Sequence, residues 1–99
     1  MLSKSIVMDL LKAGEYSKLV NYFSDEYRII LEEFLVKNKI EISDDDAMVD
    51  VIYKVKSNFP QHSGLMMLIS MSLFNEDMTT GTRIEKFIDN YNITKERLT

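Results

Sequence analysis

The residues best suited to chemistry are four aspartates in the segment SDDDAMVD, residues 43–50. Clustered carboxylate oxygens bind calcium or magnesium, because hard cations prefer oxygen ligands. An EF-hand loop, however, alternates its acids, has a central glycine and ends on a glutamate at position twelve. Here Asp44, Asp45 and Asp46 are consecutive, and position twelve is Val55. We therefore expect no metal site, and interpret these acids as the first turn of a helix, where negative charge is favourable.

His62 is the one histidine of the chain. An imidazole that acts as a general base or a metal ligand needs partner residues, and the chain has no second histidine and no cysteine. Gly14, Gly64 and Gly81 are isolated, so neither a phosphate-binding loop nor a nucleophile elbow is present. We expect His62 to be a polar residue at a helix start, and the protein to be no enzyme and to hold no cofactor.

The charge balance argues against nucleic-acid binding. The formal net charge is -4, whereas nucleic-acid-binding proteins carry a basic face that neutralises phosphates. The absence of cysteine excludes disulfides and thiolate metal sites and favours a reducing compartment, so we expect a cytoplasmic protein. The apolar run Leu65–Phe74 is about half of the roughly 20 residues that span a bilayer. No membrane segment is expected, and no signal peptide, because Asp9 interrupts the short apolar run near the N-terminus.

Helical periodicity dominates the chain, which has three glycines and one proline. The apolar spacing predicts five helices, at about 3–13, 15–37, 44–59, 61–75 and from 82 onward. The second is expected to continue through Ser24, because its apolar stripe keeps its phase there. Five helices with short connectors predict a single all-α domain over residues 1–99, a compact bundle of about five helices.

Residues near the helix ends predict how the helices start and stop. Gly14 suits the stop of the first helix, and Asn38 is expected to close the second in a left-handed conformation. Ser43 is predicted to cap the third helix. Within that helix, Asp50 and Lys54 have the spacing of an acid-to-base pair on the outer face.

The segment HSGLMMLISMSLFNED, residues 62–77, is the most apolar part of the chain. On a helical wheel with Leu68 at zero, Met66 and Leu73 lie at about 150° on one side, and Met67 and Phe74 lie at about -110° on the other. A helix that is apolar all round is normally buried all round. The sequence therefore predicts a central hydrophobic helix over about 61–75, with Leu68 in the core and the amphipathic helices around it.

A second apolar line runs along the helix predicted over 15–37. Tyr22, Ile29 and Val36 recur every seven residues outside the main stripe, with Glu26 and Glu33 between them. Heptad spacing keeps such side chains on one line that a second helix can cover. We interpret this line as a partner-binding seam, for a homodimer or for another protein. The alternative is that another helix of the same bundle covers it.

Two stretches are similar to known families. LLKAGEYSKLVNYF followed by a long helix resembles the start of HEPN-type helical domains, whose catalytic members carry an Arg-x4-6-His motif. No histidine follows Arg83, so the resemblance does not imply ribonuclease activity here. GEYSKLVNYF and IEISDDDAMVDVIYKV resemble stretches of small acidic helical immunity proteins from bacteria. Neither stretch carries a diagnostic motif, so the sequence assigns the chain to no family.

Three functions follow from these patterns. The first is a non-catalytic protein that acts by binding another protein or a second copy of itself. The second is an acidic inhibitor of immunity or antitoxin type, which would cover a basic partner with an acidic patch. That patch consists of Glu41, Asp44, Asp45, Asp46 and Asp50. The third is a small enzyme in which His62 and carboxylates such as Asp44 or Asp46 would meet in a pocket.

Overall fold

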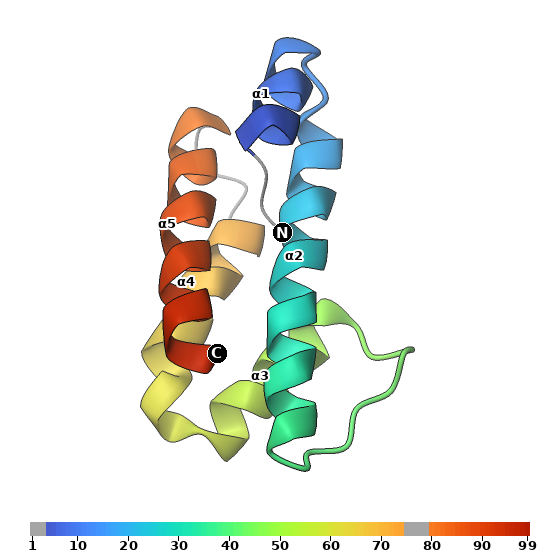
Figure 1. Ribbon diagram of the computed structural model, residues 1–99, viewed down its shortest axis with the longest axis vertical. Coiled ribbons are helices and arrows are strands. Elements are labelled where there is room, and N and C mark those ends of the chain that lie inside the picture. The colour runs from blue at the N-terminus through green and yellow to red at the C-terminus, as the bar shows by residue number, and fades with distance from the viewer. Residues whose placement is uncertain (1–3, 75–79) are drawn as a thin grey trace.

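The computed structural model describes residues 4–74 and 80–99, which form five α-helices and one 3₁₀ turn, with no strand in these ranges (Figure 1). The elements are α1 (Lys4–Lys12), α2 (Tyr16–Lys37), α3 (Met48–Asn58), η1 (Pro60–His62), α4 (Ser63–Phe74) and α5 (Thr80–Leu98). The prediction of an all-α bundle of about five helices is confirmed. The prediction that α2 continues through Ser24 is also confirmed.

Four of the helices form a ring in which each packs against two neighbours. α2 contacts α3 and α5, and α4 contacts the same two helices from the other side, while α1 packs on α2. Figure 1 shows α2 and α5 side by side along the long dimension of the molecule, with α1 at one end. In this arrangement α4 is one corner of a four-helix ring.

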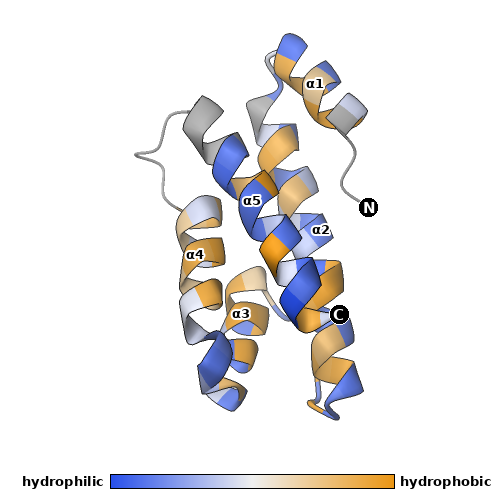
Figure 2. Ribbon diagram, turned by 60° about the vertical axis from the view of Figure 1, so that its left-hand side comes forward, coloured by the Kyte–Doolittle hydropathy of each residue, from blue (hydrophilic) through white to orange (hydrophobic). Residues whose placement is uncertain are grey.

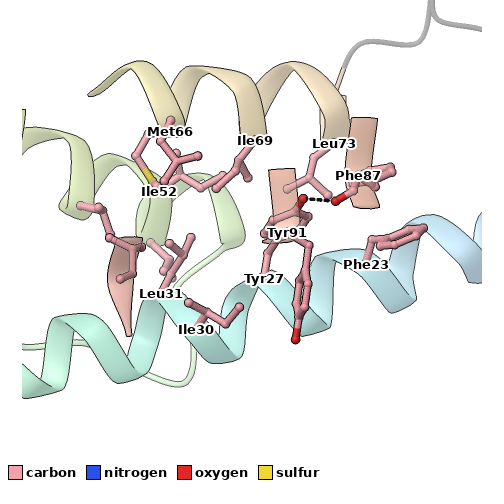
Figure 3. Packing of buried hydrophobic residues seen from close by; sticks show 14 of the residues in the cluster. Phe23, Tyr27, Ile30, Leu31, Ile52, Met66, Ile69, Leu73, Phe87 and Tyr91 are labelled. Carbon is pink, nitrogen blue, oxygen red and sulfur yellow. Dashed lines mark hydrogen bonds between the residues drawn. The ribbon is translucent and has the colours of Figure 1, made fainter. Parts of the chain in front are cut away.

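The core is built on the predicted stripe of α2. Phe23, Tyr27 and Leu31 are fully buried, and each large side chain of this kind contributes about 1.5–3 kcal/mol on burial. The Phe23 ring stacks on Phe87 of α5 with centroids 4.5 Å apart. The Tyr27 ring meets Tyr91 edge-on at 5.8 Å, and its hydroxyl donates a hydrogen bond to the Phe87 carbonyl (Figure 3). These aromatic contacts join α2 to α5.

The ends of the first two helices show one confirmed prediction and one error of a single residue. Gly14 stops α1 with a φ of 71°, the left-handed conformation that glycine adopts without strain. Asn38 was predicted to do the same for α2, but Lys39 is the residue with positive φ. Asn38 stays close to helical because its Nδ2 and its backbone N–H both donate to the Phe34 carbonyl. The backbone N–H of Ile40 then donates to the Leu35 carbonyl at 2.9 Å, and closes the helix end.

The predicted start of the third helix is wrong, since α3 begins at Met48 and Ser43 does not cap it. Ser43 instead belongs to a separate turn. Its backbone N–H donates to the Asp46 carboxylate at 3.0 Å, and the backbone N–H of Asp46 donates to the Ser43 carbonyl at 3.0 Å. At the true helix start, the Asp50 carboxylate accepts a hydrogen bond from the backbone N–H of Ala47 at 3.3 Å. The local turn uses the polar groups that the cap would need, so the helix starts later.

The all-round burial predicted for α4 is wrong. One side of α4 is buried against its neighbours, through Leu65, Met66, Ile69, Ser72 and Leu73. Leu68, which was predicted to be core, keeps 45% of its surface exposed. The physical reason is that a corner helix of a ring has two neighbours, and two neighbours cover one side of a cylinder.

Candidate protein-binding surface

The outward side of α4 is an apolar surface. The four large side chains on it are about half exposed: Met67 53%, Leu68 45%, Met71 50% and Phe74 53%. At about 100° per residue, Met67, Met71 and Phe74 fall within roughly 60° of one another, and Gly64 and Leu68 lie beside them on one side. No charged residue occurs from Ser63 to Phe74. Figure 2 shows α4 in orange and pale colours, in contrast to the blue segments of α5. We call Gly64, Met67, Leu68, Met71 and Phe74 the α4 face.

The opposite side of α4 holds this face in position. Met66, Ile69 and Leu73 point into the core toward α2, α3 and α5 (Figure 3). The Ser72 hydroxyl donates to the Leu68 carbonyl at 3.0 Å and accepts a hydrogen bond from the Asn90 side-chain amide at 3.1 Å. The buried hydrogen bond between Asn90 and Ser72 forms when the Ser72 side of α4 is turned toward α5. These contacts hold α4 with the α4 face directed away from the core.

The seam predicted on α2 is divided between surface and core. Ile29 and Val36 are exposed, as is Glu33. Tyr22, in contrast, is half-buried and packs against the core, with its ring centroid 6.0 Å from that of Phe23. Glu26 is half-buried. The structure thus leaves two exposed apolar side chains on this line where the sequence suggested three.

The acidic patch predicted over residues 41–50 lies on the connector before α3 and on its first turn. Glu41, Asp44, Asp45 and Asp50 are exposed. Asp46 is half-buried, and its carboxylate accepts a hydrogen bond from the Lys54 ammonium at 2.8 Å. That bond, together with the one from the Ser43 backbone N–H, lowers the pKa of Asp46.

The predicted pairing of Asp50 with Lys54 is wrong, because Lys54 turns toward the connector instead. Its ammonium donates to the Asp46 carboxylate and to the Glu41 carbonyl, the latter at 2.9 Å. The Asp50 carboxylate accepts a hydrogen bond from the backbone N–H of Ala47 at the start of α3. The lysine therefore neutralises part of the acidic patch and ties the connector to α3.

His62 lies at the end of η1, beside aromatic rings. Its ring meets Phe34 edge-on with centroids 5.6 Å apart, and Phe34 packs on Phe59 at 4.7 Å. Within residues 4–74 and 80–99, no group of three or more His, Asp or Glu side chains is placed to hold a metal ion. The structure thus brings His62 to an aromatic cluster that joins η1 to α2.

Sequence reasoning found the apolar segment of the α4 face but assigned it to the centre of the bundle. The signal that distinguishes the two sides is weak, because α4 is apolar around its whole circumference. The structure adds an observation about Gly64. It has no positive φ, and a Cβ added there would meet nothing within 4 Å apart from its chain neighbours and the backbone of its own helix. Neither backbone conformation nor packing within the chain requires glycine at this position.

No helix in the described parts of the chain is long and apolar enough to cross a membrane. No protein-family model matches this sequence, and the searches of curated proteins and of solved structures found no match.

Proposed function

We propose that this protein acts without catalysis, by binding another protein through the α4 face. The observation that carries the proposal is the half-exposed state of Met67, Leu68, Met71 and Phe74 on one uncharged helix side. Contiguous exposed apolar surface of this kind marks interaction sites in soluble proteins. Methionine and aromatic residues are also enriched in the buried centres of protein interfaces, where methionine adapts to irregular partners.

The energetics favour the α4 face over the line on α2. Full burial of such a side chain is worth about 1.5–3 kcal/mol, so covering the remaining half of each is worth about 1 kcal/mol. The α4 face offers four such side chains and no charge to desolvate. The line on α2 offers Ile29 and Val36, with the exposed carboxylate of Glu33 between them. The α4 face therefore gains about twice as much from one partner.

The acidic inhibitor is the second candidate, and it is supported by the exposure of Glu41, Asp44, Asp45 and Asp50. Such a complex would weaken steeply as salt screens its charges, whereas burial of the α4 face is much less sensitive to salt. Salt dependence of partner binding therefore separates the two functions.

The test is an affinity capture from the native host with wild-type protein and two matched variants. Met71→Glu places a charge on the α4 face, and Ile29→Glu places the same charge on α2 at nearly equal exposure, 50% against 52%. A partner that is retained by wild type and Ile29→Glu but lost by Met71→Glu supports the proposal. An Asp44→Asn/Asp45→Asn variant reports on the acidic patch. A partner lost by that variant and retained by Met71→Glu would contradict the proposal in favour of the acidic inhibitor.

A further inference from the structure

Four of the five residues of the α4 face have a spacing that is the same in both directions along the helix. Gly64, Met67, Met71 and Phe74 are separated by three, four and three residues, so the pattern is symmetric about Ile69. When two copies of such a helix lie antiparallel about a two-fold axis, position i of one meets position j of the other, and j meets i. Centred on Ile69, this arrangement places Gly64 opposite Phe74, and Met67 opposite Met71.

The shapes at these positions are complementary. Phe74 is the largest residue of the α4 face and is about half exposed. Gly64 has no side chain, and the space where its Cβ would lie is open to at least 4 Å. A phenyl ring from another copy can therefore approach the backbone at Gly64. Such a contact would give Gly64 a role that packing within the chain does not supply.

The charges favour a second copy at this face over other parts of the surface. Each chain has a net charge of -4, so most approaches of two copies bring like charges together. From Ser63 to Phe74 there is no charge to repel. Antiparallel helices also place the positive N-terminal end of each α4 beside the negative C-terminal end of the other.

Building on the proposed function, we infer that the partner of the α4 face is a second copy of this chain, docked antiparallel so that Gly64 of each copy receives Phe74 of the other. Four half-exposed side chains provide about 400 Å² per copy, which is below the roughly 800 Å² per partner of a standard interface. The dimer is therefore expected to be weak and to exchange with monomer.

Cysteine cross-linking tests the register directly, because the native chain has no cysteine. An equimolar mixture of Gly64→Cys and Phe74→Cys chains, one carrying a tag that changes its mass, should give a disulfide-linked heterodimer on oxidation. Either variant alone should stay unlinked. In a dimer of one variant, each copy contributes one cysteine, and the two would lie ten residues, or about 15 Å, apart along the helices. A disulfide needs Cα atoms within about 7 Å. Links in each variant alone and none in the mixture would contradict the antiparallel arrangement.

Sedimentation over a dilution series from micromolar to millimolar protein gives the dissociation constant. Wild type and Ile29→Glu should dimerise equally. Gly64→Leu should weaken the dimer by about tenfold or more, because its side chain fills the space for Phe74 at both ends of the contact. Its melting temperature at dilute, monomeric concentration should not fall, since a Cβ at position 64 would meet nothing within 4 Å apart from its chain neighbours and the backbone of its own helix.

The outcomes separate this inference from the proposed function. If wild type stays monomeric throughout while Met71→Glu still loses a captured partner, the inference that the partner is a second copy is overturned. The α4 face would then still be the binding surface, for a different protein. A dimer that neither Gly64→Leu nor Met71→Glu weakens would exclude the α4 face from the dimer contact. Both proposals would fail if Met71→Glu also retained every captured partner.

Discussion

The side-chain amide of Asn90 donates a hydrogen bond to the hydroxyl of Ser72 at 3.1 Å, and both residues are buried between α5 and α4. The network extends on each side. Ser72 donates to the Leu68 carbonyl, and the Thr94 hydroxyl donates to the Asn90 carbonyl at 2.6 Å. Among the described residues, every buried side-chain nitrogen and oxygen has a partner. This network helps to set which side of α4 faces inward, and thus which side is the α4 face.

Asn90→Ala should lower the free energy of unfolding by about 1–3 kcal/mol, because it removes the amide from a buried hydrogen bond. Urea denaturation followed by circular dichroism measures the change. Asn92→Ala is the matched control, since Asn92 is on the same helix and is exposed. Equal urea midpoints for the two variants would show that the Asn90–Ser72 bond does not stabilise the fold.

Ile69→Asp and Leu68→Asp should have opposite outcomes although the residues are adjacent. Ile69 is fully buried, so its replacement places an unpaired charge in the core and is expected to unfold the protein. Leu68→Asp would have the same outcome if Leu68 lay in the core, as its sequence pattern predicts. With Leu68 partly exposed, that variant should remain folded and lose about 1 kcal/mol or less. Far-ultraviolet circular dichroism during heating distinguishes the two. An unfolded Leu68→Asp would restore the central-helix interpretation.

Tyr27→Phe should make the protein less sensitive to alkaline unfolding. Burial raises the pKa of the Tyr27 phenol well above its ordinary value, with smaller contributions from Tyr91 and Asp89. A raised pKa in the folded state means that the stabilisation is present below about pH 10, the pKa of an unfolded tyrosine, and is lost as the pH rises above it. The free energies of unfolding of wild type and Tyr27→Phe should therefore converge as the pH increases beyond 10. Tyr53→Phe, at an exposed position, should follow wild type throughout.

Asp46→Asn should destabilise the protein near neutral pH and have a progressively smaller effect in acid. The hydrogen bond from Lys54 and that from the Ser43 backbone N–H lower the pKa of Asp46 from 3.8. A lowered pKa in the folded state means that the stabilisation is present above pH 3.8 and is lost as the pH falls through the folded value. The difference in melting temperature from wild type should shrink below that pH.

Asp45→Asn is the control for this prediction. Asp45 is the neighbouring acid and is exposed, and its backbone N–H, not its carboxylate, bonds to Ser43. An Asp45→Asn variant with the same pH profile as Asp46→Asn would show that general charge repulsion in the patch, and not the Lys54 bond, causes the effect.

Short-range chemistry made much of this fold predictable from sequence. The length of α2 follows from one apolar stripe in phase, which includes Phe23, Tyr27 and Leu31, and the stop of α1 follows from the conformational freedom of Gly14. Such signals depend on residues a few positions apart, so the sequence contains them completely.

The errors at helix ends come from polar groups that had more than one local partner. Ser43 could cap a helix or close a turn with Asp46, and Lys54 could pair with Asp50 or with Asp46. These options differ by little in energy, since ion pairs near the surface contribute little net stability. The path of the connector across the end of α3 decides between them.

The sequence by itself determined that α4 is a helix and that it is apolar, but the tertiary structure alone decided which of its sides is exposed. Hydropathy is nearly uniform around α4, so rotating it changes little in the local energy. The choice depends on neighbours distant in the chain: α3 and α5 cover one side, and Asn90 bonds to Ser72 across 18 residues. Because a ring of four helices covers each member from one side, the other side of this apolar helix remains at the surface as the candidate binding site.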